Sequence, residues 1–142
     1  MAVWLLWGLL AAVLVFAVCV RLAPSDPARW HVAPAAEGPS GTVSAGEGWA
    51  SLRLEAGDAR ALLARLDAIA IASPRTTRLA GSVEAGRITW ITRSALWGFP
   101  DYTTAEARAD GLYLYARLRF GRGDMGVNAT RLRDWQAALT GG

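Results

Sequence analysis

The residue types that could do chemistry are few, and they are unevenly placed along the 142 residues. All fifteen basic side chains are arginines, and the single Cys19 and single His31 both precede residue 49. The region after residue 48 therefore has no His, Cys or Lys, which Ser-His-Asp or Cys-His catalysis, Schiff-base chemistry and zinc binding require. It also has no glycine-rich phosphate loop. We predict no metal and no cofactor, which leaves carboxylate chemistry or binding through Arg, Tyr and Trp.

Tyrosine and arginine alternate with apolar residues in the segment 112–120. Side chains alternate between the two faces of a strand, so one face of this segment holds Tyr113, Tyr115, Arg117 and Arg119. Asp110-Gly111 predicts a hairpin turn, and the strand before it adds to that face Tyr102, Thr104, Glu106 and Arg108. Such a face suits an anionic headgroup or a protein partner. The alternative is a solvated face whose Tyr–Arg pairs only stabilise the sheet.

A first hairpin is predicted over residues 77–94, with Ala85-Gly86 as its turn. This register places Val83 opposite Ile88, Gly81 opposite Trp90, Glu84 opposite Arg87, and Arg78 opposite Arg93. Two facing arginines repel each other unless an acid or an anion lies between them. The pair Arg78 and Arg93 is therefore a candidate site for a small anion.

Carboxylates supply the alternative to binding. Asp101 and Asp124 lie in predicted turns, near Arg93 and Arg122 in sequence, and together they could form a carboxylate-based enzyme site. However, a carboxylate beside a guanidinium stays ionised, which is the wrong state for a general acid. We expect each of them to cap a turn or to pair with an arginine.

The first 22 residues predict a membrane anchor. From Ala2 to Val20 no side chain is charged, and nineteen helical residues span roughly 28 Å, close to the hydrocarbon core of a bilayer. Trp4 and Trp7 mark one end, and Arg21 marks the other. A cleaved signal peptide is the rival interpretation, but no basic residue precedes the apolar run and no Ala-x-Ala site follows it.

Three regions are predicted: an anchor over 1–22, a juxtamembrane segment and flexible linker over 23–48, and a folded domain over 49–142. Residues 33–48 contain four Gly, two Pro and four Ala, which is typical of a tether. Before them, Trp30 is a candidate interfacial anchor or docking contact, and His31 is expected to be solvated. The domain carries thirteen arginines and nine acidic residues, a charge of +4.

The domain is predicted to be α+β. Ala50, Leu52 and Leu54 alternate as a strand, Asp58 is the expected N-cap of a helix to about Ala72, and Asn128 is the expected N-cap of a final helix. With the two hairpins, the expected fold is a small antiparallel sheet of about five strands with two helices packed on one face.

Several short runs are similar to a known family. They are Arg-Leu-Arg-Phe-Gly-Arg-Gly-Asp-Met-Gly-Val-Asn-Ala-Thr-Arg at 117–131, Ile-Thr-Arg-Ser at 91–94, Gly-Phe-Pro-Asp-Tyr at 98–102, and Arg-Trp-His at 29–31. The chain resembles the bacterial and plastid family catalogued as domain of unknown function 1499. The spacing of Gly121, Asp124, Gly126, Asn128 and Arg131 is the most specific part, whereas Ala116 stands where the family would have Ser. The resemblance implies a small, often membrane-anchored domain and supplies no activity.

These observations predict a non-catalytic, single-pass accessory or binding module at a bacterial inner membrane. Its expected partner is a membrane protein or an anionic lipid. The basic excess is mild and includes no Lys-rich run, so we expect no nucleic acid. The expected binding residues are Tyr102, Tyr113, Tyr115, Arg117, Arg119, Arg78, Arg93, Asp124 and Asn128. Arg21 and Arg29 slightly favour a cytoplasmic domain under the positive-inside rule, with a periplasmic domain as the alternative.

Overall fold

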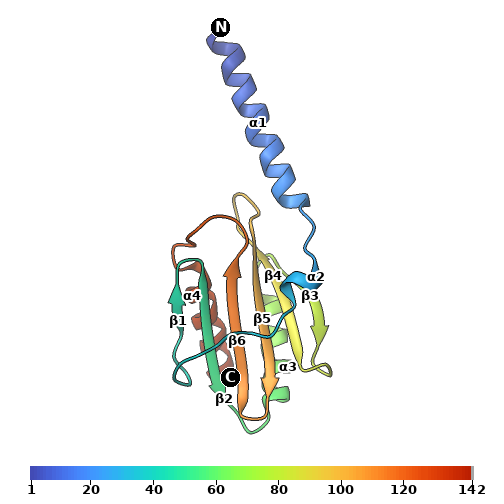
Figure 1. Cartoon of the computed structure of the whole chain (residues 1–142), viewed down its shortest axis with the longest axis vertical. Coiled ribbons are helices and arrows are strands. Elements are labelled where there is room, and N and C mark those ends of the chain that lie inside the picture. The colour runs from blue at the N-terminus through green and yellow to red at the C-terminus, as the bar shows by residue number, and fades with distance from the viewer. Residues whose placement is uncertain (142) are drawn as a thin grey trace.

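The N-terminal helix projects away from the rest of the molecule (Figure 1). The computed structural model describes residues 1–141, and helix α1 runs over Ala2–Leu22. Its residues Val3–Leu22 are long and apolar enough to cross a membrane, and a signal sequence would meet the same two criteria. Its apolar residues lie all around its surface rather than on one face, as lipid-exposed helices require.

The remainder of the chain is built on one six-stranded antiparallel sheet, in the order β1-β2-β6-β5-β4-β3. The predicted α+β class is confirmed, with one strand more than expected. The strands are β1 (Ser44–Gly46), β2 (Trp49–Glu55), β3 (Thr76–Ser82), β4 (Arg87–Arg93), β5 (Pro100–Arg108) and β6 (Gly111–Leu118). The helices are the short α2 (Pro27–Trp30), α3 (Ala59–Ala72) and α4 (Val127–Thr140).

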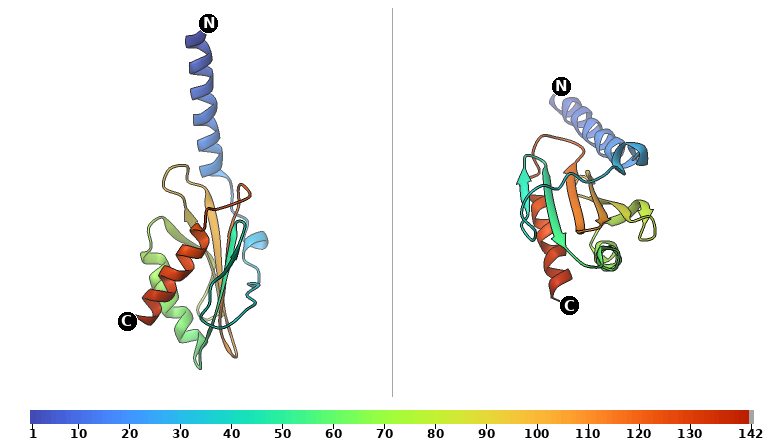
Figure 2. Two further views of the ribbon diagram at one scale, coloured as in Figure 1. Left: turned by 90° about the vertical axis from the view of Figure 1, so that its left-hand side faces the viewer. Right: turned by 60° about the horizontal axis from the view of Figure 1, so that its bottom comes forward.

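Helices α3 and α4 cover one face of the sheet, and the segment from α1 to β1 crosses the other (Figure 2). Helix α3 begins as predicted, because the Asp58 carboxylate accepts a hydrogen bond from the Ala61 amide at 2.9 Å. The helix-side core is aliphatic, apart from Trp90 and Trp135, whose rings meet edge to face at 5.6 Å. Each indole is satisfied: Trp90 Nε1 donates to Asp67 and Trp135 Nε1 donates to Ser73, both at 2.9 Å.

The predicted register of the first hairpin is wrong. Strands β3 and β4 pair Gly81 with Ile88, Ser82 with Arg87, and Arg78 with Trp90. The turn takes four residues, closed by the Gly86 amide on the Val83 carbonyl at 3.0 Å, and a bulge follows Arg78. Consequently the expected pairs Val83–Ile88, Gly81–Trp90, Glu84–Arg87 and Arg78–Arg93 do not form.

The second hairpin confirms the predicted faces. Its turn is one residue earlier than expected, so that Gly111 already pairs with Arg108. Tyr102 lies opposite Arg117, Thr104 opposite Tyr115, and Glu106 opposite Tyr113. Directly paired residues share a face, so all these side chains lie on the side away from α3 and α4. We call this side the outer face.

Much of the predicted flexible linker is held against the sheet. Residues 24–36, which we call the strap, cross the outer face over β5 and β6 (Figure 1). Farther on, Ser44–Gly46 forms β1 on the edge strand β2, and the Gly41 amide donates to the Arg53 carbonyl at 2.8 Å. The sheet therefore begins at Ser44, within the region expected to be a tether. Composition alone suggested flexibility, but backbone pairing and side-chain packing order these residues.

Candidate functional site

The strap occupies the centre of the outer face. The Trp30 ring stacks on Tyr102, with centroids 3.9 Å apart and planes 11° apart, and both side chains are buried. The guanidinium of Arg117 lies on the indole, 4.8 Å from its centroid. Three of the predicted binding residues, Tyr102, Arg117 and Arg119, therefore contact this protein's own strap.

Hydrogen bonds fix both ends of the strap. Near α1, the Tyr102 hydroxyl lies 2.7 Å from the Ser25 hydroxyl, and Arg119 donates to the Pro24 carbonyl at 2.8 Å and to Tyr102 at 3.2 Å. At the far end, Arg108 donates to the Pro34 carbonyl at 3.0 Å. Because charged donors make stronger hydrogen bonds than neutral ones, the arginines of the outer face hold the strap in place.

A chain of hydroxyl groups lies beneath the strap. Thr104 Oγ1 donates to the Trp30 carbonyl at 3.3 Å, so it must accept from Thr89 Oγ1 at 2.8 Å. Thr89 in turn accepts from Nδ1 of His31 at 2.9 Å. His31 is thus a partly buried hydrogen-bond donor, and the expectation that it is solvated is wrong. Gly81 makes room for its ring, because a Cβ there would lie 2.7 Å from His31 Cε1.

We expect this arrangement to make the docking of the strap sensitive to pH. Burial lowers the pKa of His31, the charge of Arg87 acts in the same direction, and Glu106 opposes them. Stability contributed by neutral His31 is therefore complete above its unfolded pKa of about 6.5 and is lost as pH falls toward the lower folded value. We expect His31→Asn, whose amide can still donate to Thr89, to show a weaker loss of unfolding free energy between about pH 7.5 and 5.5. Denaturant unfolding of both proteins measures this, and identical pH slopes would contradict it.

The other predicted residues of the outer face lie beside the strap. Tyr113 donates to the Asp110 carboxylate at 2.7 Å, and Arg108 lies 4.2 Å above its ring. Tyr115 stacks with Trp49 at 6.0 Å. The Tyr115 and Trp49 rings line a shallow cavity of about 230 Å³ together with Ala35, Glu37 and Ser51.

Arg78 and Arg93 do not form the predicted anion site. Arg78 binds the Asp67 carboxylate on α3, which the Trp90 indole also contacts. Arg93 donates to the Gly98 carbonyl at 3.0 Å in the loop between β4 and β5. The shifted register separates the two arginines and gives each its own acceptor.

The corner between β6 and α4 joins the remaining predicted residues. Asp124 accepts the amides of Gly126 and Asn128 at 3.0 and 2.9 Å, so Asp124 caps α4. The helix begins at Val127, and Asn128 is fully buried in its first turn, so the predicted Asn128 cap is wrong. The Asn128 side-chain oxygen accepts from Arg131, which also binds Asp101 at 3.2 Å.

The two candidate carboxylates differ in their protonation equilibria. Burial raises the pKa of Asp101, although Arg131 opposes this, and the nearby Asp124 charge adds to it. Burial would also raise the pKa of Asp124, but the hydrogen bonds that its carboxylate accepts from the backbone amides of Asn128 and Gly126 outweigh burial and lower it. Asp101 therefore pairs with Arg131 rather than Arg93, and Asp124 is held as an ionised helix cap.

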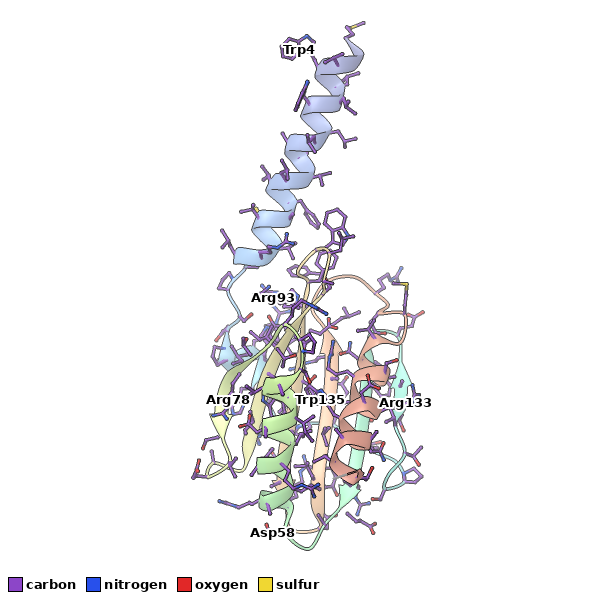
Figure 3. All side chains as sticks on the ribbon, turned by 180° about the vertical axis from the view of Figure 1, so that it is seen from behind. Trp4, Asp58, Arg78, Arg93, Arg133 and Trp135 are labelled. Carbon is purple, nitrogen blue, oxygen red and sulfur yellow. The ribbon has the colours of Figure 1, made fainter. Side chains whose placement is uncertain are left out.

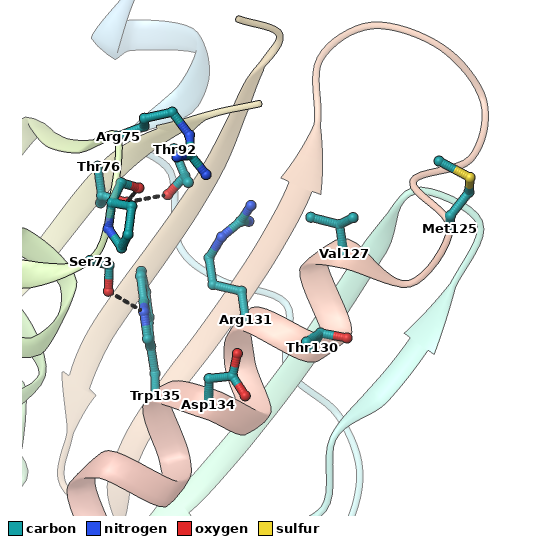
Figure 4. A pocket seen from close by; sticks show the side chains of 11 residues that line it. Ser73, Arg75, Thr76, Thr92, Met125, Val127, Thr130, Arg131, Asp134 and Trp135 are labelled. Carbon is teal, nitrogen blue, oxygen red and sulfur yellow. Dashed lines mark hydrogen bonds between the residues drawn. The ribbon is translucent and has the colours of Figure 1, made fainter. Parts of the chain in front are cut away.

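A cavity of about 500 Å³ opens beside this corner, between the start of α4 and the ends of β3 and β4 (Figure 4). Arg131 points into it from α4, facing Arg75 and Thr92 (Figure 4). The full lining is Ser73, Pro74, Arg75, Thr76, Thr92, Met125, Val127, Thr130, Arg131, Asp134 and Trp135. Within residues 1–141, Arg75 and Met125 are the non-glycine residues with positive φ, at 55° and 52°. Such conformations are uncommon and concentrate at functional sites.

Sequence reasoning did not identify the residues of this cavity as a site. Arg75 immediately precedes β3 and Thr92 lies in β4, and only the observed register brings them opposite α4. The one residue of the cavity that the sequence had indicated was Arg131, which belongs to the spacing shared with the family. Among the residues described, no three His, Cys, Asp or Glu side chains lie close enough together to bind a metal ion.

The match to a family model covers residues 20–139, nearly the whole chain after α1. The chain belongs to the family described as Protein of unknown function (DUF1499). The resemblance suspected from the 117–131 run is thereby confirmed. The matched region includes the strap as well as the sheet, so the strap is part of the family's domain. No match to the chain is found among curated proteins.

Proposed function

We propose that this DUF1499 protein is a single-pass, membrane-anchored binding module without catalytic activity. Its ligand is an anionic group, carried by a lipid or by a small soluble molecule, and it binds in the cavity beside α4. The observation that carries the proposal is the lining of this cavity, where two arginines and four hydroxyl side chains face a single carboxylate.

One arginine of the cavity lining, Arg75, makes no ion pair with a carboxylate among the residues described. Arg131 is neutralised locally by Asp101, whereas Arg75 makes its hydrogen bond, of 3.0 Å, to the neutral carbonyl of Arg93. The exposed guanidinium of Arg75 therefore supplies positive charge beside the cavity. Trp135, Val127 and Pro74 add an apolar wall. Ser73 and Thr76 donate to backbone carbonyls, and Thr92 donates to Thr76. Arg75 and the Thr130 hydroxyl are therefore the donors for a ligand, and beside an apolar wall they suit the headgroup and first carbons of an anionic amphiphile.

Binding explains the corner better than catalysis does. Asp124 is committed to the amides of α4, and Asp101 is committed to Arg131. A carboxylate-based enzyme around these two residues is the second candidate, because burial raises the pKa of Asp101, as general acids require. If an NMR titration gives the Asp101 carboxyl a pKa within the ordinary carboxyl range, the support for the enzyme is removed.

Variants at the cavity test the proposal. Thr130→Phe places a ring in the cavity, and Arg75→Asn removes its exposed charge with a residue that tolerates positive φ. Because hydrogen bonds to charged groups contribute about 1.5–3 kcal/mol, we expect Arg75→Asn to weaken binding roughly 10- to 100-fold. Native mass spectrometry of the full chain from nanodiscs measures retained phosphatidylglycerol against phosphatidylcholine, and calorimetry in detergent measures inorganic phosphate.

Two exposed residues of α4 outside the lining provide matched controls, Ala138→Phe and Arg133→Gln. Selective retention of phosphatidylglycerol that only the cavity variants weaken identifies a lipid ligand. Phosphate binding with the same dependence identifies a soluble anion. If neither probe binds, or if the controls weaken binding equally, the proposal is wrong.

The anchor and its membrane are part of the same proposal. The length and hydropathy of α1 suit a membrane span, and the lack of a basic residue before it and of an Ala-x-Ala site directly after it favours its retention. We assign it to a bacterial inner membrane. Arg21 lies in the last turn of the span and Arg29 follows it, so the positive-inside rule favours a domain on the cytoplasmic side. A reporter fused after Gly142 that is active only in the periplasm distinguishes this side from the other.

A further inference from the structure

We propose that two loops of the domain insert into the interface of the bilayer that α1 crosses. They are residues 94–99, between β4 and β5, and residues 119–127, which lead into α4. We call them the apical loops. The inference rests on the proposed anchor and adds a second contact with the membrane, made by the folded domain itself.

Large exposed apolar side chains concentrate in the apical loops. Leu96, Trp97, Phe120, Met125 and Val127 are exposed, and Met125 is 99% accessible. Elsewhere within residues 23–141, the exposed large apolar side chains are Val32 and Ile71. A gathering of such residues at one end of a domain is typical of an interaction surface, whereas single ones are ordinary.

Contacts with α1 place the apical loops at the depth of the membrane. Arg21 donates to the Leu96 carbonyl at 2.9 Å, and the Phe16 ring meets the Phe99 ring at 6.2 Å. Phe16 lies five residues before Arg21, which is about 7.5 Å farther into the span. Phe99 also meets Phe120 at 6.0 Å, which joins the second loop to the first. Both loops lie at the α1 end of the domain (Figure 3).

The composition of these loops fits lipid better than a protein partner. Tryptophan and phenylalanine favour the membrane interface, and arginines beside them can reach lipid phosphates. Arg21, Arg93 and Arg119 all donate to carbonyls at this end of the domain, on Leu96, Gly98 and Pro24. A bilayer around α1 would necessarily surround the loop that packs against Phe16, whereas a protein partner would first have to displace that lipid.

Depth measurements on the full chain test this inference. In a Cys19→Ser background, a nitroxide at Met125→Cys reports on the second apical loop, and one at Ala109→Cys reports on the hairpin at the other end of β5. In nanodiscs of phosphatidylcholine and phosphatidylglycerol, we expect the ratio of collisions with oxygen to collisions with a polar nickel complex to be several-fold higher at residue 125. As a label-free check, Trp97→Phe should remove part of the fluorescence that brominated lipids quench.

Alkaline carbonate extraction of membranes distinguishes a failure of the loop insertion from a failure of the proposed anchor. If the chain stays in the membrane pellet but residue 125 meets the nickel complex as often as residue 109, the inference is wrong and the anchor stands. Protection of residue 125 from both reagents indicates a protein contact and also overturns the inference. Release of the chain by carbonate overturns the anchor and the inference together.

Discussion

Replacing Trp30 by alanine is expected to lower the free energy of unfolding by about 3–5 kcal/mol, the usual cost of removing a buried tryptophan. The indole is 6% exposed, stacks on Tyr102 and lies under Arg117. Its loss also leaves the Tyr102 ring facing solvent or an empty space. Denaturant unfolding of the full chain in detergent, followed by tyrosine and tryptophan fluorescence, measures the change.

The position of the strap can be followed separately from global stability. Arg29 lies on the exposed side of α2, so trypsin should cut after it faster when the strap is released. Trp30→Phe should retain much of the stacking, and Val32→Ala, at an exposed strap position, is the matched control. Unchanged stability together with unchanged cleavage at Arg29 in Trp30→Ala would show that the strap contributes little.

Replacing Asp67 by alanine is expected to cost about 1–3 kcal/mol, because it leaves the buried Trp90 indole without an acceptor, whereas Arg78 is exposed and can be solvated. The carboxylate on α3 is the acceptor for the fully buried Trp90 indole and for Arg78. Thermal unfolding should show a drop in Tm of about 4–24 °C, at roughly 4–8 °C per kcal/mol for a domain of this size.

Two comparisons sharpen the Asp67 prediction. Asp67→Asn keeps an acceptor oxygen for Trp90 and loses only the charge, so it should cost less than alanine. Asp134→Ala removes an exposed carboxylate from α4 and should change stability by less than about 0.5 kcal/mol. If Asp67→Ala were no worse than Asp134→Ala, the Trp90 and Arg78 contacts would not stabilise the fold as argued.

Local patterns predicted the features that depend on neighbouring residues. The Asp58 cap and the helix after it follow from a short-range hydrogen bond. The prediction of which side chains of β5 and β6 share a face is correct although the turn lies one residue earlier than expected. The earlier turn shifts each pairing partner by two residues, and side chains two residues apart in a strand lie on the same face. The predicted register of the first hairpin is wrong because the turn has four residues and a bulge follows Arg78. Neither feature can be inferred from the Ala85-Gly86 dipeptide.

The candidate site depended on contacts between distant parts of the chain. Trp30 and Tyr102 are seventy-two positions apart, and nothing in either neighbourhood indicates that they stack. The sequence predicts the final helix with Asn128 as its cap, but Asp124 caps it instead, because Asn128 is buried beside Arg131. The predicted Tyr and Arg face exists, and its central part serves intramolecular packing instead of a free surface.

The docked strap also limits how far the domain can move from α1. A flexible linker of 16 residues, as predicted for 33–48, would let the domain move about 20–24 Å from the end of the juxtamembrane segment. In the structure the chain is held from Pro24 onward, almost immediately after α1 ends at Leu22. With α1 in a bilayer, as we propose, rotation and tilt of the span would be transmitted to the sheet, and the domain would be held at a fixed height relative to the lipid. Any binding partner would have to present its own contact surface at that height.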